Sequence, residues 1–110
     1  MYILGRDIKD ISQTAESLNA KPIVCDITKP EDISKIVSQI DETGLDLLVN
    51  NAGISNPKPI SEITYDDFYE SFNTNVRGPL FLIKELIPFL SKQKGYASYR
   101  VNIRQQCIPY

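Results

Sequence analysis

Two adjacent asparagines, Asn50 and Asn51, come directly after an apolar run and directly before Ala52 and Gly53. An amide side chain both donates and accepts hydrogen bonds, and small residues let a ligand approach the backbone closely. In open α/β sheets, ligands bind at the carboxyl ends of buried strands, which is where this run would place the amides. The segment therefore predicts a ligand site, although a buried strand followed by a polar turn would use the same residue types.

Polar groups elsewhere in the chain could face the same ligand. Arg6 and Asp26 each follow a short apolar run, and Ile27 comes directly after Asp26. Asn75 lies further along, shortly before Gly78. Taken singly, each has an ordinary explanation: an arginine solvated at a helix start, an aspartate in a turn, or an amide at a helix kink.

The spacing of apolar residues predicts the elements that must position these groups. Short apolar runs at 2–4, 22–25 and 45–49 indicate buried strands. Between the first two runs, helical spacing of Ile8, Ile11, Ala15 and Leu18 predicts a helix. Strand and helix alternate in this way in parallel sheets with right-handed crossovers.

Three further helical patterns follow. Thr28 with Glu31 forms a capping-box pattern. An apolar stripe at helical spacing follows it: Ile33, Ile36, Val37 and Ile40. Thr64 with Asp67 starts another helix, and Gly78-Pro79 then interrupts the helical pattern, which resumes over 80–90. We therefore expect either one long kinked helix or two in tandem in this last part.

Composition narrows the classes of function. The 110 residues carry a net charge of −2, so no basic footprint for nucleic acid is present. With two cysteines and no histidine, a zinc site of the usual ligands is excluded and a disulfide framework is not expected. No apolar run approaches the length that crosses a membrane, and no signal peptide is recognisable. We expect a protein of the reducing cytoplasm that binds neither membrane nor nucleic acid.

The octet from Asp46 to Gly53, D-L-L-V-N-N-A-G, resembles a motif of the short-chain dehydrogenase/reductase family. This resemblance extends from Met1 to about Lys92. Members have a Rossmann-type fold and move hydride between NAD(P) and a carbonyl or alcohol. The implied fold class is α/β, a partial Rossmann-type doubly wound parallel sheet that lacks the first strand and the C-terminal part. The implied domains are a partial NAD(P)-binding domain at 1–94 and a divergent tail at 95–110 that could supply a fifth strand.

The resemblance assigns a role to each candidate residue. Arg6, with Gly5 where an acid would accept bonds from the ribose of NAD, implies NADP. Asp26 and Ile27 resemble the pair that contacts the adenine. In the octet, Asn51 resembles the residue beside the adenosine ribose, Asn50 looks structural, and Ala52 and Gly53 leave room for the cofactor. Asn75, in N-V-R-G, resembles the catalytic asparagine that holds a water of the proton relay.

Other parts of the family pattern are missing. The first strand and its glycine-rich turn, which bind the pyrophosphate, would precede Met1. The catalytic serine position falls on Asn102 or Gln105, depending on how the fifth strand is matched within 96–103. Tyr96 and Arg100 imitate the spacing of the Tyr-x-x-x-Lys pair, but they lie in the expected strand, where residues four apart do not share a helical turn.

The resemblance therefore implies a fragment of an NADP-dependent oxidoreductase of small carbonyls or alcohols, which we expect to be inactive as this chain alone. Without the glycine-rich turn, NADP binding is expected to be weak or absent. The alternative is a non-catalytic interaction or regulatory fragment that pairs with a full-length relative. Because the missing strand would lie between the first and third strands of this chain, self-association or pairing with such a relative is expected.

Overall fold

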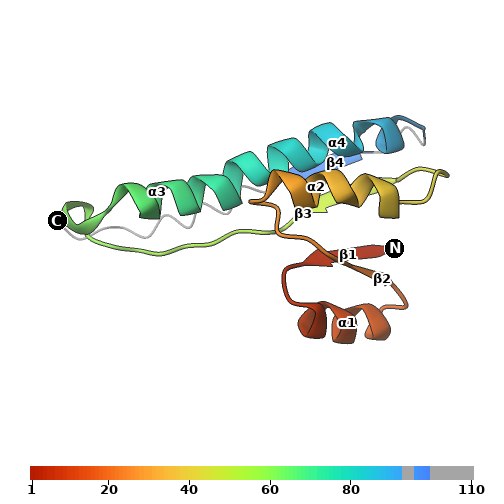
Figure 1. Cartoon of the computed structure of the whole chain (residues 1–110), viewed down its shortest axis with the longest axis horizontal. Helices are drawn as coiled ribbons and strands as arrows, with labels where there is room; N and C mark the ends of the chain where they lie inside the picture. Colours follow the sequence, from red (N-terminus) through yellow and green to blue (C-terminus); the bar gives the residue numbers. More distant parts are fainter. Residues whose placement is uncertain (93–95, 100–110) are drawn as a thin grey trace.

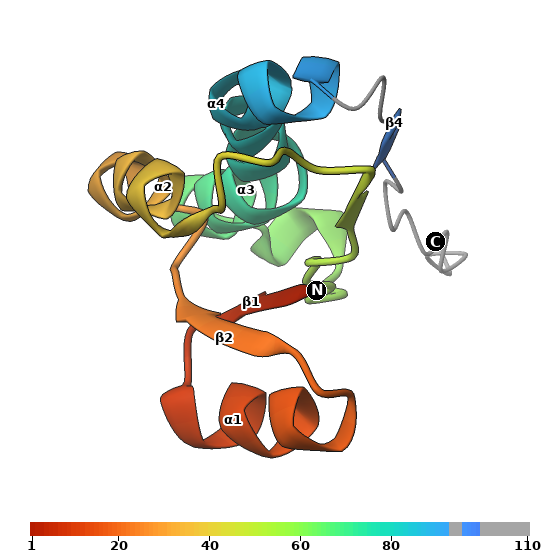
Figure 2. The same cartoon turned by 90° about the vertical axis from the view of Figure 1, so that its right-hand side faces the viewer.

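The computed structural model describes residues 1–92 and the backbone of residues 96–99. It begins with a strand, a helix and a parallel strand: β1 (Tyr2–Gly5), α1 (Ile8–Ser17) and β2 (Lys21–Val24). The register of the strands runs from Tyr2 opposite Lys21 to Gly5 opposite Val24. Helix α1 lies on the outer face of this pair, as Figure 2 shows. The predicted strand–helix–strand order is thereby confirmed.

Helix α1 begins where the sequence offers a cap. The carboxylate of Asp7 accepts from the backbone N–H groups of Lys9, at 2.8 Å, and Asp10, at 3.4 Å. Ile11 and Ala15 of the predicted stripe are buried, whereas Ile8 and Leu18 at its ends are exposed. A sheet of two strands is narrow, so it covers only the middle of the helix.

A second parallel pair consists of β3 (Leu47–Asn50) and β4 (Tyr96–Tyr99), with Leu47 opposite Tyr96. The expected strand after residue 95 is therefore present at Tyr96–Tyr99. Its expected continuation to Ile103, with Arg100, Asn102 and Gln105, lies outside the described residues. Since Tyr96 is on a strand, its helical pairing with Arg100 is not supported.

The remaining helices lie between and beside these pairs. Helix α2 (Pro30–Ile36) runs into a 3₁₀ turn, η1 (Val37–Gln39), and a second 3₁₀ turn, η2 (Ile60–Glu62), precedes α3. Helix α3 (Tyr65–Phe72), a π-helical segment η3 (Asn73–Arg77) and α4 (Gly78–Lys92) follow one another without a break. Figure 1 shows them as one long rod. The expectation of a kinked or tandem helix is met by a π segment, a feature that occurs often at functional sites.

The predicted capping box at Thr28 and Glu31 is wrong. Helix α2 has Lys29 at its N-cap with no side-chain cap bond, and Pro30 occupies the first turn. Proline lacks an N–H and has a fixed φ, so it favours the first helical position and moves the cap to its predecessor. The Thr28 hydroxyl instead donates to the carboxylate of Asp26, at 2.7 Å.

The main core lies between the two strand pairs and the helices α2 and α4. Six buried residues form it: Ile23, Cys25, Ile36, Ile40, Leu82 and Leu86. Partly buried residues of β1 and β3, including Leu4 and Leu48, pack against this cluster. The stripe predicted for α2 meets the core at Ile36. In α4 the core face is Leu82 and Leu86, whereas Leu80 and Ile87 of the predicted stripe are exposed.

The described strands form two separate parallel sheets, β1–β2 and β3–β4. The molecule is elongated, with principal extents of 51 × 29 × 24 Å, because the α3–α4 rod extends beyond both sheets (Figure 1). The two sheets face each other, and the candidate ligand site lies between them.

Candidate functional site

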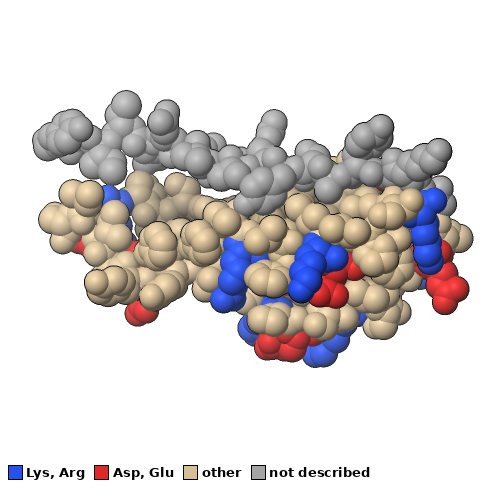
Figure 3. All heavy atoms as spheres, turned by 90° about the horizontal axis from the view of Figure 1, so that it is seen from above, with Lys and Arg blue, Asp and Glu red and all other residues tan. Residues whose placement is uncertain are grey.

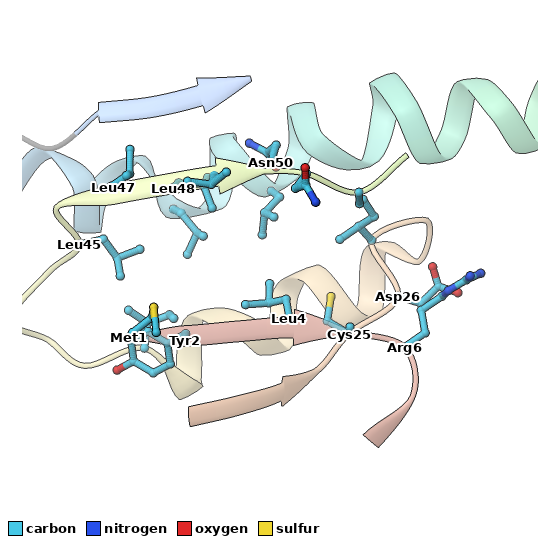
Figure 4. A pocket seen from close by; sticks show the side chains of 18 of the residues that line it. Met1, Tyr2, Leu4, Arg6, Cys25, Asp26, Leu45, Leu47, Leu48 and Asn50 are labelled. Carbon is cyan, nitrogen blue, oxygen red and sulfur yellow. The ribbon is translucent and has the colours of Figure 1, made fainter. Parts of the chain in front are cut away.

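A groove of about 970 Å³ lies between β1 and β3 (Figure 4). It brings together the six residues that the sequence predicted as cofactor-binding: Arg6, Asp26, Ile27, Asn51, Ala52 and Gly53. They come from the carboxyl ends of β1, β2 and β3 or the loops that follow, although they are spread over nearly half the chain. The predicted convergence at one edge of the strands is therefore present in the structure.

Asp26 is held in a turn directly after β2. Its Oδ1 accepts from the backbone N–H of Thr28, at 3.0 Å, and from the Thr28 hydroxyl, at 2.7 Å. The Asp26 N–H in turn donates to Oδ2 of Asp32, at 3.0 Å, at the start of α2. Thr28 thus orients the carboxylate through its Oδ1, and Asp32 fixes the backbone of the same residue.

The charge state of Asp26 follows from several opposing effects. Burial disfavours its ionised form, but the bonds from Thr28 and the nearby charges of Lys29 and Arg6 outweigh that effect, and the pKa is lowered. Asp26 is consequently an anion at neutral pH. It can accept a hydrogen bond from an amino group such as the exocyclic amine of an adenine.

Arg6 lies beside Asp26 at the carboxyl end of β1, and both are labelled in Figure 4. The guanidinium is exposed, so it can reach a charged group of a ligand at the groove. Gly5 before it has a packing reason: a Cβ there would lie 2.3 Å from Cγ2 of Ile11. A glycine at position 5 therefore lets α1 pack on β1, so the lack of an acid there also has a structural reason.

The two asparagines after β3 have different surroundings. Asn50 is 5% exposed, whereas Asn51 is exposed and lines the groove with Ala52 and Gly53. A buried amide in this position forms part of the framework, and an exposed one can contact a ligand. The distinction that the sequence suggested between Asn50 and Asn51 agrees with their burial.

Asn75, the predicted catalytic residue, is in the π-helical segment and does not line the groove. Its Oδ1 accepts from the backbone N–H of Ile54, at 2.8 Å, and its Nδ2 donates to the carbonyl oxygen of Ile54, at 2.9 Å. The side chain thereby fixes the loop that follows Gly53. In this structure, Asn75 acts on the groove through Ile54, which lines it.

Three residues that support the site were not identified from the sequence. Thr28 orients Asp26, and Arg77 donates from Nη2 to the carbonyl oxygen of Thr28, at 2.7 Å. At Gly78, a Cβ would lie 2.6 Å from the carbonyl oxygen of Ile27. The D-x-T spacing of Asp26 and Thr28 is a local signal that could have been recognised, but the contacts of Arg77 and Gly78 span about fifty residues and have no local signal.

A buried thiol, Cys25, also lines the groove. Burial, followed by the charges of Asp32 and Asp26, raises its pKa to about 11. The thiolate is the nucleophilic form, so this cysteine is unreactive at neutral pH and serves as an apolar wall residue.

The comparisons agree with the geometry. The model of the short chain dehydrogenase family matches residues 1–97. The chain belongs to this family. Galactitol 2-dehydrogenase of Agrobacterium fabrum is 39% identical over 88 residues, which are 76% of this chain and 34% of that protein. Sepiapterin reductase of Chlorobaculum tepidum is 33% identical over 72% of this chain and 33% of its own length. The chain thus spans about a third of these relatives.

Solved structures support the same fold. NADPH-bound carbonyl reductase from chicken fatty liver aligns with a TM-score of 0.71 and 28% identity, over 83% of this chain and 40% of that one. An alcohol dehydrogenase from Thermococcus sibiricus, complexed with 5-hydroxy-NADP, aligns with a TM-score of 0.78 over 87% of this chain and 44% of that one. At 21% identity, the second likeness concerns the fold alone. The fold is therefore α/β and of partial Rossmann type.

The described residues form neither a metal cluster nor a membrane-spanning helix. Among them, no three or more histidine, cysteine, aspartate or glutamate side chains gather as a metal site would require. In the same part of the chain, no helix is both long and apolar enough to cross a membrane.

Proposed function

We propose that this chain carries the adenosine end of an NADP site of a short-chain oxidoreductase that acts on a small carbonyl or alcohol. The observation that carries the proposal is the convergence of Arg6, Asp26 and Asn51 on one groove. Their chemistry fits the group: a cation for a 2′-phosphate, a carboxylate for the adenine amine and an amide for the ribose. The family and the NADPH-bound neighbour support a nicotinamide cofactor. The usage of cysteine favours a cytoplasmic location.

When bound, a nicotinamide cofactor supplies hydride chemistry. What the described residues of this chain contribute is binding and orientation: Ile27 covers one face of the adenine, Asp26 accepts from its amine, and Gly53 leaves space for the backbone to approach. Binding is expected to be weak, because these residues contact only the adenosine end. A cradle for the pyrophosphate would add charge-assisted hydrogen bonds of about 1.5–3 kcal/mol each.

The test of this site is a chemical-shift titration with adenosine 2′,5′-bisphosphate, NADP and NAD. We expect weak binding with a preference for the 2′-phosphorylated ligands. An exposed ion pair contributes up to about 1 kcal/mol, so Arg6→Ala should weaken NADP binding about fivefold and remove the preference over NAD. Lys9→Ala, which removes an equal charge from α1 outside the groove, should leave it unchanged. Equal affinity of the unmodified chain for NADP and NAD would refute the role of Arg6.

A second expectation concerns turnover by this chain alone. Among the described residues that line the groove, burial raises the pKa of Cys25 to about 11, and the hydrogen bond to Asp41 raises the pKa of Tyr2, so we expect neither to transfer a proton readily at neutral pH. Consumption of NADPH across a panel of carbonyl compounds should therefore equal the blank without enzyme. A rate clearly above that blank, which Tyr96→Phe abolishes, would show that Tyr96 is catalytic after all.

The second candidate function is a non-catalytic fragment that pairs with a full-length relative or with itself. The specific observation in its favour is the helical stripe of α4, of which Leu80 and Ile87 are 58% and 51% exposed while Leu86 is 2% exposed. Large apolar side chains that remain uncovered on one helix face favour association.

A further inference from the structure

The turn after β2 that carries Asp26 separates two cavities. Ile27 and Thr28 line the groove on one side of the turn and a smaller cavity of about 300 Å³ on the other. Arg77 lines the smaller cavity but not the groove. Because there is space on both sides of the turn, close packing alone does not fix its position, and specific contacts must do so.

Two contacts with the rod of helices restrain the turn in opposite directions. Nη2 of Arg77 donates to the carbonyl oxygen of Thr28, at 2.7 Å, and both residues are half-buried. A hydrogen bond from an ionised donor is stronger than one between neutral groups, so this bond opposes movement of the turn away from the rod. Movement toward the rod is limited at Gly78, where a Cβ would lie 2.6 Å from the carbonyl oxygen of Ile27.

The residue that Arg77 holds is the residue that orients Asp26. Thr28 donates through its hydroxyl and its backbone N–H to Oδ1 of Asp26, at 2.7 and 3.0 Å. A displacement of Thr28 therefore moves or releases the carboxylate that lines the groove. A displacement of about 1 Å is enough to weaken recognition by a directed hydrogen bond, so the restraint at Thr28 controls what Asp26 can recognise.

We propose that Arg77 is a positioning residue that determines the choice of base at this site. By holding Thr28, it orients Asp26 toward the exocyclic amine of an adenine and so selects an aminopurine over an oxopurine. This assignment rests on the proposed function. An oxopurine such as hypoxanthine presents an acceptor where adenine presents a donor, and the carboxylate repels that acceptor. Arg77 itself needs no contact with the ligand, because it lies behind the turn.

The experiment is a chemical-shift titration of the whole chain with NADP and with its hypoxanthine analogue, which differs only in the base. We expect the unmodified chain to prefer NADP by about tenfold. Arg77→Met keeps a long side chain but removes the donors, so the preference should fall below about twofold, chiefly through weaker binding of NADP. Loss of charge alone would weaken the binding of both nucleotides equally.

Two further variants separate positioning from charge and from general stability. Arg77→Lys restores a cationic donor to the carbonyl oxygen of Thr28, so it should restore most of the preference for NADP. Lys9→Met removes an equal charge from an exposed position of α1 outside the groove, and the preference should stay at about tenfold.

A measurement on the unmodified chain decides if Arg77→Met fails to fold. Coupling between two contacts is reciprocal, so a ligand that favours the held turn also strengthens the bond from Arg77 to Thr28. Saturating NADP should therefore slow the exchange of the Arg77 side-chain hydrogens with water, and the hypoxanthine analogue should slow it less.

The outcomes distinguish this assignment from the proposed function. A preference for NADP that persists in Arg77→Met, or equal slowing of Arg77 exchange by the two nucleotides, overturns the assignment alone. Equal binding of the two nucleotides to the unmodified chain also overturns it, because Asp26 then does not distinguish the bases. If the unmodified chain binds neither nucleotide, the proposed function fails and the assignment fails with it.

Discussion

A single carboxylate, Asp67, fixes the start of α3 from three directions. It accepts from the ammonium group of Lys58, at 2.6 Å, and from the backbone N–H and hydroxyl of Thr64, at 2.9 and 2.8 Å. These bonds, that from Lys58 first, lower the pKa of Asp67 to about 2 from an ordinary value of 3.8. The helix start predicted at Thr64 with Asp67 is confirmed; the two residues form a capping box, and Lys58 links it to the preceding loop.

A pH dependence of stability follows from this pKa. Because the folded state holds Asp67 ionised down to about pH 2, its contribution is complete above pH 4 and is lost as the pH falls from there through 2. Asp67→Asn should therefore lower the free energy of unfolding at pH 6 and have progressively less effect toward pH 2. Urea unfolding at several pH values measures this difference.

The control for that experiment lies in the same helical turn. Asp66→Asn removes an equal charge but leaves the contacts of Asp67 in place, so its effect should be smaller and should not follow the titration of Asp67. A constant difference between the unmodified chain and Asp67→Asn from pH 6 to pH 2.5 would contradict the assignment.

At this scale the sequence predicted which residues would line one groove wherever a residue follows a strand directly, while their roles in binding stay predictions. Arg6, Asp26 and Asn51 could be selected because the ends of parallel strands converge, whatever the lengths of the connecting helices. The surroundings of Asn75 could not be predicted in the same way. Its amide is taken up by the backbone of Ile54, and that contact depends on how the π segment meets the loop after β3.

Among the elements, α4 depends on one close approach to the loop after β2. A Cβ at Gly78 would lie 2.6 Å from the carbonyl oxygen of Ile27 and 2.9 Å from its Cγ1. The first contact is with backbone, so it cannot be relieved by rotating a side chain. Gly78 therefore sets the distance between α4 and the turn that carries Asp26 and Ile27.

Gly78→Ala should lower the free energy of unfolding by about 1–3 kcal/mol, the usual cost of overpacking. The matched control is Gly53→Ala, a glycine in the exposed loop after β3, which should change stability little. Denaturant unfolding of both variants makes the comparison. Equal stability of Gly78→Ala and the unmodified chain would show that α4 is free to move away from Ile27.

Element boundaries were predicted where cap residues and periodicity agree, as at α3. The start of α2 was wrong because two local preferences compete: the Thr28 hydroxyl can cap a helix or bind Asp26, and Pro30 decides in favour of the second. The π segment between α3 and α4 has no distinct sequence period, since its residues continue the helical pattern.

At the scale of the whole molecule, association depends on how much apolar surface the fold leaves exposed. The face in Figure 3 shows charges of both signs gathered toward one end, while the α3 end is mostly uncharged. In α3, four aromatic residues are exposed: Tyr65, Phe68, Tyr69 and Phe72. The family pattern predicted an incomplete sheet. Which side chains of α4 stay exposed depends on how this helix packs against α2, and the sequence does not specify that packing.

We expect the exposed apolar side of α4 to cause association of the chain at tens of micromolar. Leu80 and Ile87 share the uncovered side of α4, and burying a leucine or isoleucine side chain contributes about 1.5–3 kcal/mol. Replacing both by lysine should raise the dissociation constant of the dimer or aggregate by more than about tenfold. The matched double variant, Ile8→Lys with Leu18→Lys, removes equally exposed side chains from α1 and should leave association unchanged. Sedimentation velocity separates these outcomes, and a sharp monomer with a cooperative thermal transition would show that the uncovered face of α4 is stable in water.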